Sequence, residues 1–220
     1  MLENGYEYVD LGLPSDTMWA TCNIGADKPE DYGLLFQFGR VDGYRFGDKN
    51  NKFRTKEQNK QDTGNEYIPI TTSGKVYKKY DILDLNDDAA YVNMGGAWHM
   101  PTYYQLEELL NNTSHKIETI KDVKGMMFTS KINGQQLFIP FMQGYWYNGD
   151  YNKAKSCACI WSSQVYASYI NIAYVLYCNS DGHAYVFGNG FSSAFSVRGV
   201  FNINEHTNNV EHTNNINMLI

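Results

Sequence analysis

The clearest helical pattern in the chain is an apolar stripe at Leu106, Leu109 and Leu110, which are spaced three and four residues apart. Thr102 precedes this stripe, and Gln105 lies three positions after Thr102. This spacing predicts a capping box at the start of a helix. Two asparagines then end the apolar run. We therefore predict a helix that begins after Thr102 and ends at this Asn-Asn pair.

Strand-type patterns and turn residues fill most of the remaining chain. The segment 124–141 predicts a hairpin, because Asn133-Gly134 supplies the positive φ values of a tight two-residue turn between two apolar runs. Pro29, followed by two acidic residues, predicts the start of a short helix. Residues 42–66 are polar, charged and without a period, so we predict a long surface loop there.

The final third of the chain is nearly free of charge. Between Ser162 and Val197 the only formal charge is Asp181, whereas the 19% charged residues of the whole chain would place about seven there. Tyr, Phe, Ser, Asn and Gly take the place of the missing charges, rather than the aliphatic residues that a core prefers. Such a composition is typical of antibody paratopes, in which rigid tyrosines make contacts and small polar residues adapt. A buried aromatic sheet is the alternative.

Composition and charge exclude several classes of function. The chain has 220 residues, 43% of them hydrophobic, and a net charge of −6, with no Lys/Arg cluster that could neutralise nucleic-acid phosphates or bind an anionic membrane. No apolar run is long enough to span a membrane, and no signal peptide is visible. We expect the four cysteines to be free thiols, although their even number leaves two disulfides open.

Three tryptophans and one arginine are expected to have structural roles. Trp19, Trp98 and Trp161 should fill the core, and the indole N–H groups of Trp19 and Trp98 should be bonded to the backbone. Arg198 should bridge strands through its guanidinium, which can satisfy several carbonyls or a carboxylate. Two neighbouring acids, Asp87 and Asp88, are either its partners or a cap for the chain that enters Ala89.

Several segments in fixed order carry a family resemblance. These are YVDLGLPSDTMWATCNIGA, PEDYG, DDAAYVNMGGAWHMPTYYQLEELL, NGQQLFIPFMQGYW and IWSS followed by FSVRGVF. Together they resemble the Fibrobacter succinogenes major paralogous domain of gut Bacteroidetes, over residues 6–201. The resemblance implies an α+β C-type lectin fold of the formylglycine-generating-enzyme-like branch, with two helices on a mixed or antiparallel sheet and long loops. It gives one domain over 1–201 and a polar extension over 202–220.

The C-terminal part resembles, more narrowly, the variable region of proteins diversified by retroelements. This resemblance implies a variable region over about 160–201, in which constant residues hold the fold and the others contact ligand. The constant frame would be Trp161, Ser162, Ser163, Ser196, Val197 and Arg198. The ligand-binding positions would be Ala167, Tyr169, Ile170, Ile172, His183, Tyr185, Phe187, Gly188, Asn189, Phe191 and Ser193. Gly199 departs from the pattern, since a proline is common there.

The resemblance also raises an enzymatic alternative, which the residues do not favour. Formylglycine-generating enzymes need reactive cysteines that bind copper, and the Cys157-x-Cys159 pair lacks a second pair of soft ligands at a convincing spacing. No metal or other cofactor is expected. A calcium-dependent sugar site is not expected either, because the Glu-Pro-Asn or Gln-Pro-Asp and Trp-Asn-Asp triplets of calcium-binding lectins do not occur in the sequence.

The sequence thus predicts a non-enzymatic display protein that binds varied targets through its uncharged C-terminal face. Its ligand would be a protein or a glycan on a cell surface. The protein itself would be a receptor-binding protein of a phage virion or a component of a bacterial cell surface. The alternatives are a non-diversified adhesin or structural subunit of gut bacteria, and an oxidoreductase like the formylglycine-generating enzymes. Oligomerisation is open in each case.

Overall fold

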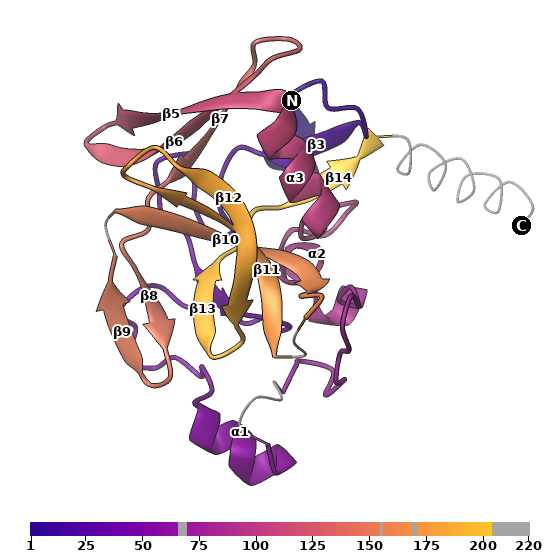
Figure 1. Cartoon of the computed structure of the whole chain (residues 1–220), viewed down its shortest axis with the longest axis vertical. Coiled ribbons are helices and arrows are strands. Elements are labelled where there is room, and N and C mark those ends of the chain that lie inside the picture. Colours follow the sequence, from indigo (N-terminus) through magenta and orange to yellow (C-terminus); the bar gives the residue numbers. More distant parts are fainter. Residues whose placement is uncertain (66–69, 155, 169–170, 204–220) are drawn as a thin grey trace, which may run out of the picture.

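The protein is an α+β domain built mostly from strands (Figure 1). The computed structural model describes residues 1–65, 70–154, 156–168 and 171–203. Within these residues the strands form three sheets, and the helices lie outside them. Two of the predicted ligand-binding positions, Tyr169 and Ile170, and the extension from 204 onward lie outside the described residues.

The largest sheet has seven strands and carries most of the C-terminal third. Its order is β12-β11-β10-β13-β8-β9, with β4 paired to β13. All pairs are antiparallel except β10 with β13. The strands are β4 (Leu35–Gln37), β8 (Gly144–Tyr147), β9 (Asp150–Lys153), β10 (Cys157–Val165), β11 (Ile172–Asn179), β12 (Ala184–Gly190) and β13 (Ser193–Ser196).

Two smaller sheets complete the strand structure. One has the order β1-β2-β3-β14 and joins the two ends of the domain, because β14 pairs with β3 and sets Val200 opposite Trp19. Its strands are β1 (Leu2–Glu3), β2 (Tyr6–Asp10), β3 (Thr17–Ala20) and β14 (Val200–Asn202). The other is the meander β5 (Thr113–Ile120), β6 (Val123–Ser130) and β7 (Gln136–Pro140).

The best-defined helix, α3 (Tyr103–Asn112), confirms the sequence prediction. Thr102 is its N-cap, and Gln105 completes the capping box. Leu106 and Leu109 are fully buried, so the apolar stripe faces the core as its spacing requires. The other helices are α2 (Ala89–Met94) and α1 (Lys56–Thr63), with a 3₁₀ turn, η1 (Leu85–Asp87), before α2.

Two predictions about helices are wrong. Residues 42–66 are not a continuous loop, because α1 begins there at its own capping box of Thr55 and Gln58. This helix has no apolar stripe, which is why hydrophobic spacing did not reveal it. No helix starts at Pro29, where the chain makes turns instead.

The tight turn of the meander lies between β5 and β6 rather than at Asn133-Gly134. Lys121 and Asp122 form a two-residue connection with φ values of 44° and 69°, the signs of a type I′ turn. Lys121 is held there by an ion pair with Glu30 at 2.8 Å. The predicted hairpin of β6 and β7 exists, but its loop is longer than two residues, and the Asn133 side chain in it donates to the carbonyl of Asp10 at 2.9 Å.

The three predicted core tryptophans are all fully buried, at 0% exposure. Trp98 Nε1 donates to the Glu3 carbonyl at 3.0 Å, and Trp161 Nε1 donates to the Phe36 carbonyl at 2.8 Å. Trp19 differs, because its Nε1 is buried and has no hydrogen-bond partner within the described residues. The predicted backbone bond is therefore confirmed for Trp98 and wrong for Trp19 within the described residues.

Arg198 is a fully buried cross-link between segments. Its guanidinium donates to the carbonyls of Ala20, Thr21 and Phe138 and to the side chain of Asn23, at 3.1, 2.6, 3.2 and 2.9 Å. Burial lowers the pKa of Arg198 to about 10, so the group still carries its charge at neutral pH. The carbonyl option of the sequence analysis is thus correct for this arginine.

The acids Asp87 and Asp88 have other partners. Asp88 caps α2 by accepting from the amides of Ala90 and Tyr91, and it also accepts from the amide of Met100 at 2.8 Å. Asp87 accepts from the hydroxyl of Tyr77 at 2.6 Å. Capping of the chain that enters Ala89 is therefore confirmed, and pairing with Arg198 is wrong within the described residues.

Candidate binding face on strands β11 and β12

The β11–β12 hairpin forms the free end of the large sheet. Its register is regular, with Tyr177 opposite Tyr185 and Val175 opposite Phe187. Directly opposed residues of an antiparallel pair share one face of the sheet, and successive residues alternate between faces. Tyr177, Tyr185 and Phe187 therefore lie on one face, where their ring centroids are 5.2 to 5.8 Å apart.

This aromatic trio continues into an open groove of about 380 Å³, which we call the aromatic groove. Strands β8, β10, β11, β12 and β13 all contribute to it. It is lined by Met142, Tyr145, Tyr147, Cys157, Cys159, Tyr177, Phe187, Asn189, Ser193 and Phe195. None of these lining side chains carries a formal charge. The groove thus offers broad ring surfaces to a ligand without the desolvation cost of a charged group.

A few polar groups interrupt the aromatic surface. Asn189 accepts from the hydroxyl of Ser193 at 3.2 Å, and the remainder of its amide makes no other hydrogen bond within the described residues. At the rim, Lys56 Nζ lies 3.1 Å from the hydroxyl of Tyr147 and 5.4 Å from the centre of that ring. These groups can orient a ligand by hydrogen bonds while the rings supply contact area.

The cysteines in the groove are thiols, and all four cysteines of the chain are free. Cys157 is half-buried, and Cys159 is 5% exposed on the same face of β10. Burial raises the pKa of Cys157, an effect that a hydrogen bond with Tyr177 partly opposes, and burial raises the pKa of Cys159 further. Thiols with raised pKa values are poor nucleophiles at neutral pH, so this pair does not resemble an activated catalytic site.

The structure places the predicted ligand-binding residues that it describes in different parts of the sheet. Tyr185, at 47% exposure, Phe187 and Asn189 lie together on the face of the aromatic groove. His183 is exposed in the hairpin turn and Ala167 is half-buried after β10. Ile172 and Gly188 belong to the opposite face of the sheet, where a Cβ on Gly188 would lie 2.9 Å from the ring of Tyr166.

Phe191 and Ser193 do not belong to an exposed face, which corrects their assignment as contact residues. Phe191 is 5% exposed and stacks on Phe38, with ring centroids 4.6 Å apart. Ser193 is 3% exposed at the base of the groove. Both follow the last residue of β12, where the chain turns from the edge of the sheet into its interior strand β13.

Sequence reasoning missed the side of the groove that β8 provides. Tyr145 and Tyr147 line the groove, whereas Trp146 between them is 2% exposed and packs against Phe53. Two partly exposed tyrosines on either side of a buried tryptophan show the two-residue period of a strand that has one face exposed to solvent. That signal was present in the segment 144–147. Tyr177 was also missed, because it lies among apolar residues of β11.

The predicted frame residues are all buried, as a structural role requires. Trp161 and Arg198 are at 0% exposure, Ser162 is at 0% and Ser163 is at 2%. The backbone of Ser163 links the sheet to the segment before α3 by donating to the Pro101 carbonyl at 2.8 Å. Ser196 and Val197 are buried beside them. These residues belong to the interior of the domain, and of them Ser196, at 5% exposure, also borders a second hollow.

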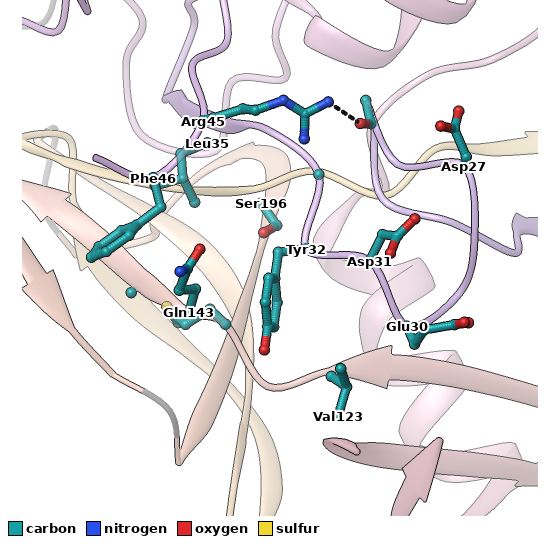
Figure 2. A pocket seen from close by; sticks show the side chains of 14 residues that line it. Asp27, Glu30, Asp31, Tyr32, Leu35, Arg45, Phe46, Val123, Gln143 and Ser196 are labelled. Atoms are coloured by element: carbon teal, nitrogen blue, oxygen red, sulfur yellow. Dashed lines mark hydrogen bonds between the residues drawn. The ribbon is translucent and has the colours of Figure 1, made fainter. Parts of the chain in front are cut away.

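A second hollow, of about 410 Å³, lies between the 25–33 segment and the start of β8 (Figure 2). Its rim is charged, with Asp27, Asp31 and Arg45 among the lining residues. Arg45 is turned toward the carbonyl of Gly25, at 3.4 Å, and the carboxylate of Glu30 is directed away from Tyr32 and Gln143. None of the predicted ligand-binding residues that the structure describes lines this hollow.

Comparisons of the chain with models of protein families, with curated proteins and with solved structures give no match. Within the described residues, no helix is long and apolar enough to cross a membrane.

Proposed function

We propose that this protein is a non-enzymatic binding protein of C-type lectin fold, and that it captures a protein or glycan on its aromatic groove. The observation that carries the proposal is the gathering of Tyr177, Tyr185 and Phe187 on one uncharged, partly exposed face. Aromatic anchors in a concave surface dominate binding energies in protein interfaces. Phe187 and Tyr177 pack against a buried cluster that includes Trp161 and Phe195, which supports the face from within.

The display role is the second part of the proposal. In it, a retroelement diversifies the exposed positions of the groove, and the protein serves at the surface of a phage or of a bacterial cell. The motifs of the frame support this reading, and so does the contrast between the buried frame residues and the more accessible Tyr185 and Phe187, which are exposed and partly buried, respectively. An adenine-rich copy of the region and a reverse transcriptase gene beside the locus are expected. Their absence would leave a binding protein that is not diversified.

Binding is tested on intact gut bacterial cells and on an array of neutral glycans as probes. The variants Tyr185→Ala and Phe187→Ala remove anchors from the groove, and Tyr104→Ala removes an equally large ring that is 72% exposed on α3. We expect a target of the wild type to lose at least about tenfold in affinity with each groove variant, since an anchor is worth about 2 kcal/mol. The α3 variant should bind normally. Equal binding by all three variants would contradict the proposal.

A further inference from the structure

Strand β12 has a free edge whose hydrogen-bonding groups can be identified from its pairing with β11. The amide of Asn179 donates to the carbonyl of His183 at 3.0 Å, and at the other end the amide of Phe191 donates to the carbonyl of Asn171 at 3.2 Å. Hydrogen-bonded and non-bonded pairs alternate along an antiparallel ladder. The register between these ends has no shift, so the odd-numbered residues of β12 bond to β11.

The even-numbered residues of β12 consequently direct their N–H and C=O groups away from the sheet. These residues are Ala184, Val186, Gly188 and Gly190. Within the described residues, none of their outward backbone groups has a hydrogen-bond partner. β12 is also the terminal strand of its sheet, and it lies in the foreground of Figure 1. The strand therefore presents a row of alternating donors and acceptors to solvent.

Helix α3 packs against one face of β12, through Ala184 and Val186, but the strand lacks the charged residues, prolines and bulges that protect other edges. Proteins protect free edges with charged residues, prolines or bulges. Strand β9, at the opposite end of the same sheet, carries Asp150 and Lys153, and the edge strand β5 carries Lys116 and Glu118. The seven residues of β12 include no charge, no proline and no bulge. An unprotected edge of this length is suited to strand addition.

We propose that β12 pairs in antiparallel fashion with β12 of a second copy of the chain, about a two-fold axis at Phe187. In this register Val186 faces Gly188 of the second copy, and Ala184 faces Gly190. Every outward N–H and C=O group then meets a partner, because hydrogen-bonded pairs fall on the four even-numbered residues. The bulky half of each strand lies against the glycine half of the other, and no like charges meet.

The pairing would join the two aromatic grooves into one surface. Phe187 of each copy lies at a non-hydrogen-bonded site, where opposed side chains approach most closely. Tyr185 stands opposite Asn189 of the second copy, so each subunit adds an aromatic and an amide group beside the groove of the other. The dimer requires no ligand, and its test is therefore separate from that of the proposed function.

Sedimentation velocity of the full chain over a range of micromolar concentrations tests the dimer. We expect the wild type to reach twice its chain mass of 25.2 kDa. The variant Phe187→Lys places two ammonium groups together at the axis and should shift the protein to monomer. Val186→Pro removes one outward N–H, a change that edge strands tolerate, and should act in the same direction. Tyr104→Lys, on exposed α3, is the matched control and should remain dimeric.

Hydrogen exchange distinguishes the edge from other interfaces. The amides of Val186 and Gly188 should exchange more slowly as protein concentration rises, since they are free in the monomer and bonded in the dimer. A wild type that is monomeric throughout would overturn the proposal, as would a dimer that both β12 variants leave intact. Protection of these amides only after addition of an uncharged extended peptide would assign the edge to a partner segment instead, and would also overturn it.

Discussion

Strands β12 and β13 are separated by two residues and have similar compositions, yet they have opposite environments. Both consist of aromatic, small and amide or hydroxyl residues without charge. Every residue of β12 is at least partly exposed, whereas all four residues of β13 are buried. The difference comes from their neighbours: β12 pairs with β11 alone, and β13 lies among β10, β8 and β4. Position in the sheet, rather than residue type, separates the contact surface from the frame.

Removal of the Arg198 guanidinium should give the largest loss of stability. Arg198→Met keeps most of the volume but leaves three backbone carbonyls and the Asn23 side chain without their donor. We expect the free energy of unfolding to fall by more than about 3 kcal/mol, because each buried unsatisfied acceptor costs about 1–3 kcal/mol. Guanidinium denaturation measures this. A loss below about 1 kcal/mol would show that the frame does not depend on this residue.

The comparison of the two strands is sharpened by a matched pair of ring deletions. Phe191→Ala removes a buried ring stacked on Phe38, and we expect a loss of about 3–5 kcal/mol. Tyr185→Ala removes a half-exposed ring from β12, and we expect a loss of less than about 1 kcal/mol. Urea denaturation gives both values. Equal losses would mean that the exposed ring is as important to folding as the core ring.

Two glycines of β12 should respond differently to the same substitution. A Cβ on Gly188 would lie 2.6 Å from Ile172 and 2.9 Å from the ring of Tyr166, so Gly188→Ala should cost about 1–3 kcal/mol. A Cβ on Gly190 has no atom within 4 Å, and Gly190→Ala should change stability by less than about 0.5 kcal/mol. Thermal unfolding of the two variants checks this. The reverse order would contradict the described packing of the hairpin.

The smallest expected effect concerns thiol reactivity in the groove. Half-buried Cys22 and Cys157 should react with iodoacetamide in the native protein, whereas buried Cys159 and Cys178 should react only after unfolding. Because burial raises the pKa of the Cys157 thiol above that of a free cysteine, its alkylation rate should keep rising at pH values where a free thiol is already fully ionised. Mass spectrometry of alkylated peptides measures the rates. Equal rates for all four thiols would contradict the burial of the groove base.

Local sequence signals were sufficient to predict an element where its structure depends on residues that are neighbours in the sequence. The capping box at Thr102 and the leucine stripe fixed α3, and the cap at Thr55 marks α1 in hindsight. Tertiary contacts decided other cases. Lys121 adopts a left-handed conformation where Glu30 pairs with it, and the Asn133 side chain both accepts from the amide of Gln135 in its own loop and donates to the distant carbonyl of Asp10.

The candidate site was predictable only in part for the same reason. Tyr185 and Phe187 were identified by composition, but composition could not place Phe191 in the core, because it differs from them only by following the turn into β13. Tyr145 and Tyr147 come from a strand about forty residues earlier and reach the groove through the pairing of β8 with β13. Such long-range pairings are set by the whole sheet and not by local sequence.

In the proposed function, strand β12 carries the residues that contact ligand, whereas β13 and Arg198 maintain the fold that holds it. Saturation mutagenesis of residues 184–198, scored by protease resistance of the displayed protein, tests it most directly. We predict that Tyr185, Phe187 and Asn189 accept most substitutions without loss of folding, and that Phe191, the residues of β13 and Arg198 accept few. Equal intolerance across both strands would contradict the claim, because β12 would then be a structural element like its neighbour.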